Sequence, residues 1–143
     1  MLRLCQINDC HDIWQINQEE LNYNVPFEVV EKQLLKILQD PNQQIYVYES
    51  DKRVVGYVHA SKYDLLYAPP LITILGIAVL KEYQRNGIGG LLLLMVEDWA
   101  NDCGISGVQL NAGVNREIAH KFYEAWGYEC RKEQLNFVKM LVD

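Results

Sequence analysis

Residues 71–79, read as LITILGIAV, form a nearly unbroken apolar run. Because apolar and polar side chains do not alternate in it, the run predicts a central strand that is buried on both faces of a sheet. A glycine-rich loop, EYQRNGIGG at 82–90, follows it, and the apolar block LLLLM comes next. The chain therefore passes from a buried strand through a glycine loop into a buried helix, which we expect from about residue 89 to 101.

The remaining elements complete one α/β domain. Helices are expected after Asn8 and Asp9 and from Pro26 to Asp40, where apolar residues recur at helical spacing. The pair Asp51-Lys52 between two β-rich segments predicts a hairpin turn. Strands are expected at 2–7, 44–50, 53–61, 107–112 and 135–141, and a last helix at 116–126. This order predicts a single domain over residues 1–143, with a mixed, mostly antiparallel central sheet flanked by helices.

Charge and cysteine content narrow the function. The net charge is −6, and an acidic chain argues against nucleic acid as a partner because phosphate binding needs a basic field. The four cysteines form no CxxC pair and accompany no histidine cluster, so we expect no metal site. The N-terminus does not resemble a signal peptide, and no apolar run approaches the roughly 20 residues that span a bilayer. We therefore expect a cytoplasmic protein with no membrane partner.

The glycine loop has two interpretations. Free N–H groups at a helix start form an anion site, and the glycines would let a phosphate approach the backbone closely. A P-loop is excluded because no Gly-Lys pair is present, and a dinucleotide fingerprint is excluded because no acidic residue lies about 20 positions later. The other interpretation is a strand-to-helix turn with packing glycines, and the loop alone does not decide between the two.

Two segments carry a family resemblance. The triplet Ile77-Ala78-Val79 followed by QRNGIG at 84–89 resembles the acetyl-CoA motif Q/R-x-x-G-x-G/A of the GNAT superfamily of N-acetyltransferases. Downstream, AHKFYEAWGY at 119–128 resembles the A-x-x-F-Y-E-x-x-G-F/Y segment of that family. The order of elements matches the family fold, so the resemblance covers nearly the whole chain.

The resemblance implies a site for acetyl-CoA as cosubstrate. The diphosphate would bind backbone N–H groups at 85–90, and the pantetheine arm would pair with the strand that ends at Val79. The backbone N–H of Val79 would stabilise the oxyanion, and Tyr123 would protonate the leaving thiolate as general acid. The implied cofactor-binding residues are Ile77, Ala78, Val79, Gln84, Arg85, Asn86, Gly87, Ile88, Gly89, Gly90, Asn115 and Arg116.

Several of these residues have a second interpretation. Tyr123 lies on an apolar helix stripe and could be a core tyrosine, and Arg85 could be a solvated loop charge. Either Asn115 or Arg116 would contact the cofactor, and Asn115 could instead be a helix N-cap. Tyr57 and His59 share one face of a strand, which either lines the substrate cleft or packs in the core.

The general base is not assigned. Many family members carry a glutamate on one of two strands, where this chain has Thr73, Leu75, Gln109 and Asn111. A water chain to His59, Asp64 or a distant carboxylate could remove the proton instead. The family's acceptor pocket corresponds to residues 9–39 and 61–70, whose carboxylates and tyrosines suit a cationic amine. Those side chains are Glu19, Glu20, Glu28, Glu31, Tyr63, Asp64 and Tyr67.

Two functions remain in contention. The first is transfer of acetyl from acetyl-CoA to a primary amine of a small molecule or peptide, by direct attack in a ternary complex. Candidate acceptors are a polyamine, an aminoglycoside-like amine, an amino acid or a protein N-terminus. The alternative is a non-catalytic acyl-CoA-binding sensor of the same fold, which the missing carboxylate favours. A homodimer is expected by analogy with the family.

Overall fold

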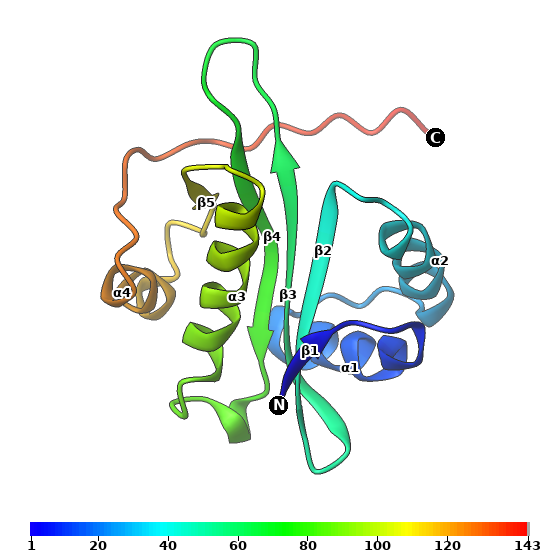
Figure 1. Ribbon diagram of the computed structural model, residues 1–143. Helices are drawn as coiled ribbons and strands as arrows, with labels where there is room; N and C mark the ends of the chain where they lie inside the picture. Colours follow the sequence, from blue (N-terminus) through cyan, green and yellow to red (C-terminus); the bar gives the residue numbers. More distant parts are fainter. Residues whose placement is uncertain (143) are drawn as a thin grey trace. The chain divides into compact units, whose positions relative to one another are not determined.

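The computed structural model describes residues 1–142 and divides into two compact units, residues 1–111 and residues 112–143 (Figure 1). The first unit begins with strand β1 (Leu2–Leu4), a 3-10 turn (Ile7–Asp9) and helices α1 (Cys10–Leu21) and α2 (Phe27–Leu38). Strands β2 (Gln43–Ser50), β3 (Arg53–Tyr63) and β4 (Leu71–Val79) follow, and then a second 3-10 turn (Lys81–Tyr83), helix α3 (Ile88–Asp102) and strand β5 (Val108–Leu110). The predicted α/β class is confirmed, whereas the single-domain assignment stays a prediction.

The five strands form one sheet in the order β1-β2-β3-β4-β5. The first three pairings are antiparallel, and β4 pairs with β5 in parallel. The hairpin between β2 and β3 turns at Asp51 and Lys52, as predicted, and both residues have positive φ (53° and 65°). Two consecutive left-handed residues give the turn whose twist matches that of the flanking strands.

Helices cover both faces of this sheet (Figure 1). Tyr57 of β3 donates a hydrogen bond to Asn17 of α1, whereas its neighbour Gly56 lies close to Ile88 of α3. Successive strand residues point to opposite faces, so α1 and α3 lie on opposite sides of the sheet. The side chains that fill these two layers and are almost fully buried are Ile16, Val47, Val54, Val55, Val58, Ile72, Leu92, Leu93 and Val96.

The salt bridge at the N-terminal end of the first unit closes the turn before α1. The guanidinium of Arg3 contacts both carboxylate oxygens of Asp9, each at 2.8 Å, and Asp9 also accepts the N–H of Gln6. Burial would raise the pKa of Asp9, but these hydrogen bonds outweigh it and hold the pKa below its usual range. Asp9 is therefore a buried, ionised and fully partnered carboxylate.

The second unit contains helix α4 (Glu117–Ala125). The strand predicted at 135–141 is wrong, because residues 128–142 form no helix or strand. Its apolar side chains are exposed, with Leu135 at 82% and Phe137 at 87%. Apolar, β-branched composition supplies strand propensity only, and a strand forms where a neighbouring backbone pairs with it. Among the helices of residues 1–142, none has the length and apolarity to cross a membrane.

Candidate active site

Strand β4 has an open edge over its second half. Within the first unit β5 pairs only with Ile72, Thr73 and Ile74, so residues 75–79 have no strand partner on that side. A β-bulge marks the point of divergence, because Ile74 pairs with Ala60 and Gly76 pairs with His59. The extra residue between them, Leu75, is exposed. Bulges of this kind disrupt a ladder locally and often lie beside functional sites.

The backbone of this open edge presents unpaired N–H groups. The N–H of Leu80 donates to the carbonyl of Val55 at 2.8 Å, so Leu80 faces β3. Because residues of an antiparallel pair alternate between facing the partner and facing away, Ile77 and Val79 point away from β3. The carbonyl of Val79 accordingly accepts a hydrogen bond from the Gln84 side chain at 2.9 Å. Within residues 1–111 the N–H groups of Ile77 and Val79 thus have no strand partner, and an extended ligand could pair with them.

The loop after β4 connects the open edge to the start of α3. Arg85 and Gly87 both have positive φ (67° and 79°), and Gly87 is the N-cap of the helix. The first intrahelical bond runs from Leu91 N–H to Gly87, which leaves the N–H groups of residues 88–90 without intrahelical acceptors. The described residues provide no side-chain cap, and the first turn carries no acidic residue. This helix start therefore has free donors of the kind that bind anions, and the anion site expected at the loop stays a prediction.

Close packing holds the strand and the helix start together. A Cβ placed on Gly56 of β3 would lie 3.1 Å from Val79 Cγ2, 3.2 Å from the Ala78 carbonyl oxygen and 3.5 Å from Ile88 Cγ2. Glycine at this position therefore allows β4 and α3 to approach β3 closely. Ala78 and Ile88, both predicted cofactor residues, are buried in this contact and can reach a ligand through their backbones only.

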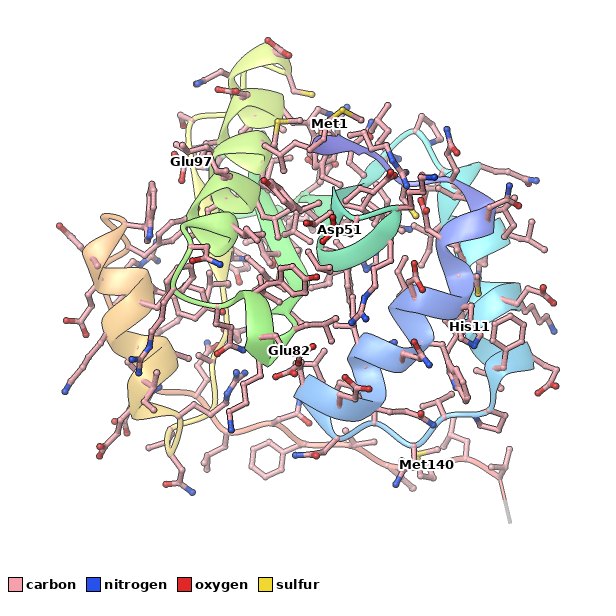
Figure 2. The ribbon with its side chains drawn as sticks, turned by 90° about the horizontal axis from the view of Figure 1, so that it is seen from below. Met1, His11, Asp51, Glu82, Glu97 and Met140 are labelled. Carbon is pink, nitrogen blue, oxygen red and sulfur yellow. The ribbon has the colours of Figure 1, made fainter. Side chains whose placement is uncertain are left out.

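Helix α1 supports the same loop through Glu20. The Lys81 N–H donates to Glu20 Oε2 at 3.0 Å, and the Gln84 amide lies 3.4 Å from Glu20 Oε1. Figure 2 shows the segment that carries Glu82 beside the end of α1. Glu20 was expected in the acceptor pocket, and its contact with the loop was not predicted. The side-chain amide of Gln84 donates to Glu20 and to the Val79 carbonyl, whereas the side chains of Arg85 and Asn86 are exposed.

The α1 face of the sheet carries polar groups on β2 and β3. Burial raises the pKa of Tyr57 to about 12, so its hydroxyl stays protonated and donates to Asn17. Two residues further on, His59 Nε2 lies 2.6 Å from Gln43 Oε1, and Gln43 Nε2 donates to Asp40 Oδ2 at 2.9 Å. Burial lowers the pKa of His59, which favours the neutral ring.

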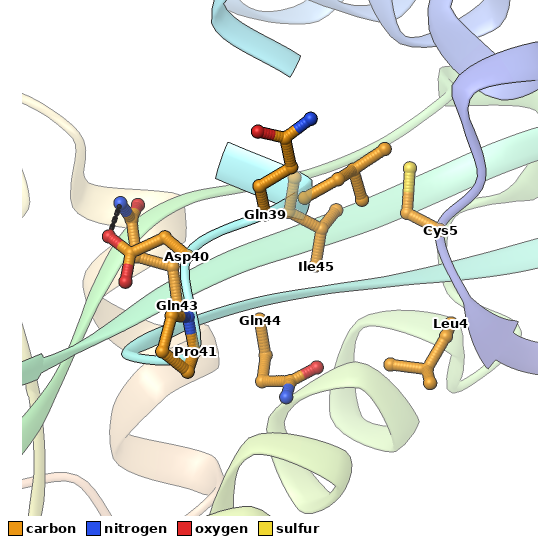
Figure 3. Close-up of a pocket in the computed structure, with 9 residues that line it drawn as sticks. Leu4, Cys5, Gln39, Asp40, Pro41, Gln43, Gln44 and Ile45 are labelled. Carbon is orange, nitrogen blue, oxygen red and sulfur yellow. Dashed lines mark hydrogen bonds between the residues drawn. The ribbon is translucent and has the colours of Figure 1, made fainter. Parts of the chain in front are cut away.

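A cavity of about 320 Å³ lies beside this polar chain, between β1, the end of α2 and the start of β2. Figure 3 shows Asp40 and Gln43 joined by their hydrogen bond at one side of it. Its lining residues are Leu4, Cys5, Leu38, Gln39, Asp40, Pro41, Gln43, Gln44 and Ile45. Burial raises the pKa of Cys5 to about 12, so its thiol is protonated and unreactive at neutral pH.

The other predicted residues lie in the second unit. Tyr123 is half-buried on α4 and packs against Phe122 and Tyr128, with ring centroids 5.2 and 6.3 Å away. Burial raises the pKa of Tyr123, and the charge of Arg116 partly opposes this. The N-cap of α4 is Arg116 and not Asn115, so the interpretation of Asn115 as an N-cap is wrong. Tyr123 is accordingly a protonated phenol at neutral pH.

The sequence profile of the acetyltransferase (GNAT) family matches residues 10–128, and the chain therefore belongs to the GNAT acetyltransferase family. This confirms the predicted family, the fold and the enzyme class of N-acetyltransferase. The family also implies that the chain binds acetyl-CoA.

Individual relatives are distant in sequence. An aminoglycoside N(6')-acetyltransferase type 1 from Acinetobacter baumannii is 27% identical over 107 residues, which make up 72% of this chain and 73% of that protein. A transcriptional regulator from Bacillus halodurans C-125 superposes with a TM-score of 0.90 at 19% identity, over 97% of this chain and 99% of that one. The aminoglycoside acetyltransferase AAC(6')-Iy, in complex with the bisubstrate analogue CoA-S-monomethyl-acetylneamine, gives a TM-score of 0.87 at 19% identity, over 98% and 97%. At these identities the structural matches show the fold alone.

Proposed function

We propose that this enzyme transfers the acetyl group of acetyl-CoA to a primary amine of a small molecule or peptide, by direct attack of the amine in a ternary complex. The observation that supports this is one continuous series of unpaired backbone donors. The N–H groups of Ile77 and Val79 face the open edge of β4, and the loop then leads to the uncapped start of α3. An extended acyl-CoA arm can add to such an edge as a strand would, while its diphosphate accepts hydrogen bonds from a helix start.

Each predicted cofactor residue has a distinct part in this proposal. The backbone N–H groups of Gly87, Ile88, Gly89 and Gly90 would hold the diphosphate, since Gly87 adopts a conformation that glycine favours. Residues 77–79 would pair with the pantetheine arm. Arg85 and Asn86 are exposed beside the helix start and would add charge and hydrogen bonds. Gln84 would act by holding the Val79 carbonyl, and Asn115 or Arg116 would contact the cofactor from the second unit.

The chemistry needs an oxyanion donor and an acid. As the amine nitrogen bonds to the thioester carbon, negative charge develops on the carbonyl oxygen, and the free N–H of Val79 would stabilise it. The carbon–sulfur bond then breaks, and the sulfur would take the proton of the Tyr123 hydroxyl. Burial keeps that phenol protonated at neutral pH, which a general acid requires.

The acceptor is proposed from the relatives and from charge. The similar proteins from Acinetobacter are named for acetylation of aminoglycosides, which are polycationic amines. The net charge of −6 suits a cationic acceptor. Aminoglycosides are therefore the first amines to test, followed by polyamines, amino acids and peptide N-termini. A homodimer and a cytoplasmic location stay predictions.

The experiment combines calorimetry with a thiol-release assay. Acetyl-CoA should bind, and at least one amine of the panel should release CoA. Gly89→Asp places a carboxylate in the first turn of α3 and should abolish binding, whereas Ser106→Asp adds the same charge beyond the far end of that helix and should not. Binding without CoA release on any amine would support the sensor. An affinity that Gly89→Asp leaves unchanged would exclude the proposed site.

A further inference from the structure

A hydrogen-bonded chain of three side chains fixes the proton on one nitrogen of His59. Asp40 accepts the Asn42 N–H through Oδ1 and the Gln43 amide through Oδ2, each at 2.9 Å. The hydrogen bond from Gln43 is the larger cause that lowers the pKa of Asp40, so Asp40 is an ionised acceptor at neutral pH. Gln43 must therefore turn its NH₂ group to Asp40 and its oxygen to His59. The oxygen is an acceptor, so Nε2 of His59 carries the hydrogen, and Nδ1 keeps a lone pair when the ring is neutral.

Nδ1 of His59 is open to solvent. Every buried side-chain nitrogen or oxygen of the described residues has a hydrogen-bond partner, and Nδ1 has none among them. An unpartnered Nδ1 must for that reason lie where water reaches it.

His59 lies one strand away from the open edge of β4, on the face of the sheet that α1 covers. His59 shares a face with Tyr57, whose hydroxyl contacts α1, and it pairs with Gly76, the first residue after the bulge. Gly76 has no side chain, and the Tyr57 hydroxyl lies 3.7 Å from where a Cβ on Gly76 would stand. Adjacent strands lie about 4.8 Å apart, so a ligand added at the edge of β4 would lie two strand spacings from β3, and water would carry the proton across to the imidazole.

We infer that His59 is the general base of this enzyme: its Nδ1 takes the proton that the substrate ammonium must lose before it attacks, and Gln43 and Asp40 position the ring. This inference rests on the proposed acetyl transfer. The ammonium gives one proton to Nδ1, its nitrogen then bonds to the carbonyl carbon, and the carbon–sulfur bond breaks. The sulfur takes the Tyr123 proton, the second proton of the nitrogen restores that hydroxyl through solvent, and the imidazolium releases its proton to water. The site thus gains a base although Thr73, Gln109 and Asn111 offer no carboxylate.

The titratable and charged groups around the ring are few. Tyr57 lies on the same strand, and the charge of Tyr23, which follows α1, contributes to raising its pKa. The charge of Lys36 on α2 contributes to lowering the pKa of Asp40. The carboxylate of Glu20 on α1 accepts hydrogen bonds from the Lys81 N–H and from the Gln84 amide. Tyr57 titrates far above neutral pH and Asp40 well below it, so the acid limb of the rate profile should report His59.

The test begins with His59→Gln. It should lower kcat/KM on the order of 10²–10⁴-fold and remove the acid limb, while the calorimetric Kd for acetyl-CoA stays unchanged and shows that the variant is folded. Gln43→Glu together with Asp40→Asn keeps a donor at position 40 for the new carboxylate and should shift the acid limb to higher pH, because a carboxylate beside Nε2 favours the imidazolium. Lys52→Gln replaces an exposed residue of the turn between β2 and β3 and should leave rate and profile unchanged.

The outcomes separate this inference from the proposed function. If wild type acetylates no amine, the proposed transfer fails and His59 has no catalytic role. If wild type is active and His59→Gln keeps its rate and acid limb, the inference alone fails. Nitrogen NMR of the free protein gives a readout that needs no turnover: neutral His59 should carry its proton on Nε2, and a proton on Nδ1 would overturn the assignment.

Discussion

Replacing Gly87 by alanine tests whether backbone conformation is the reason for glycine at the start of α3. Gly87 has φ 79° and ψ 3°, in the left-handed region. A Cβ placed there meets no heavy atom within 4 Å, so the cost of a methyl group is conformational. A left-handed L-residue costs about 1–2 kcal/mol, and the smaller entropy of the unfolded alanine chain returns about 0.4–1 kcal/mol. The expected net loss of stability is therefore between about 0 and 1.6 kcal/mol, with a midpoint of about 0.8 kcal/mol.

Urea unfolding of three proteins measures this loss. Asparagine adopts the left-handed region more readily than alanine, so Gly87→Asn should be more stable than Gly87→Ala although its side chain is larger. Acetyl-CoA should raise the stability of all three, because the backbone N–H groups that would bind it remain. An alanine variant more stable than wild type, or an asparagine variant less stable than the alanine one, would refute the conformational argument.

Further predictions concern the acid, a loop contact and a buried carboxylate. Tyr123→Phe should lower kcat on the order of 10²–10⁴-fold and leave the Kd for acetyl-CoA unchanged in calorimetry, and unchanged turnover at neutral pH would remove Tyr123 from the mechanism. Glu20→Ala removes the acceptor of the Lys81 N–H and should weaken acetyl-CoA binding several-fold with little effect on kcat; an unaltered affinity would contradict the role of Glu20 in holding the loop. Asp9 has a lowered pKa, so its stabilisation is present above the unfolded value of about 3.9 and is lost as pH falls through the lower folded pKa. Asp9→Asn should therefore cost about 2–3 kcal/mol at neutral pH and flatten the acid side of the urea-midpoint profile, whereas a slope like that of wild type would show that other carboxylates determine acid unfolding.

Local sequence signals predicted most of the fold. The apolar run at 71–79 coincides with β4, and Asp51-Lys52 forms the hairpin turn, because burial on both faces and left-handed turn residues each leave a direct mark on composition. The prediction of a strand at 135–141 was wrong because the apolar pattern indicates only a propensity for strand. A strand forms when a distant segment pairs with it, and local sequence does not report that pairing.

The site was predictable where backbone conformation determines it. Residues 84–90 carry their glycines in the sequence, so a loop that leads into an uncapped helix start could be recognised, whereas anion binding there stays a prediction. The contact of Glu20 with Gln84 spans 64 residues, and that of His59 with Gln43 spans 16 and depends on the registration of two strands. Neither glutamine nor an exposed glutamate has a distinctive sequence context, so only the folded chain brings these partners together.

Because of the bulge at Leu75, which N–H groups face the open edge depends on the register of β4 more than on the identity of its side chains. The N–H of Ile72 donates to Gly107, so in an uninterrupted strand Gly76 and Ala78 would be the residues that face outward. The inserted residue changes this parity, and the outward positions become Ile77 and Val79. Substitutions at the exposed position 75 should be tolerated, whereas a register without the bulge, in which Leu75 paired with His59, would turn both N–H groups into the sheet. In this fold the register of one strand decides which amides are available for chemistry.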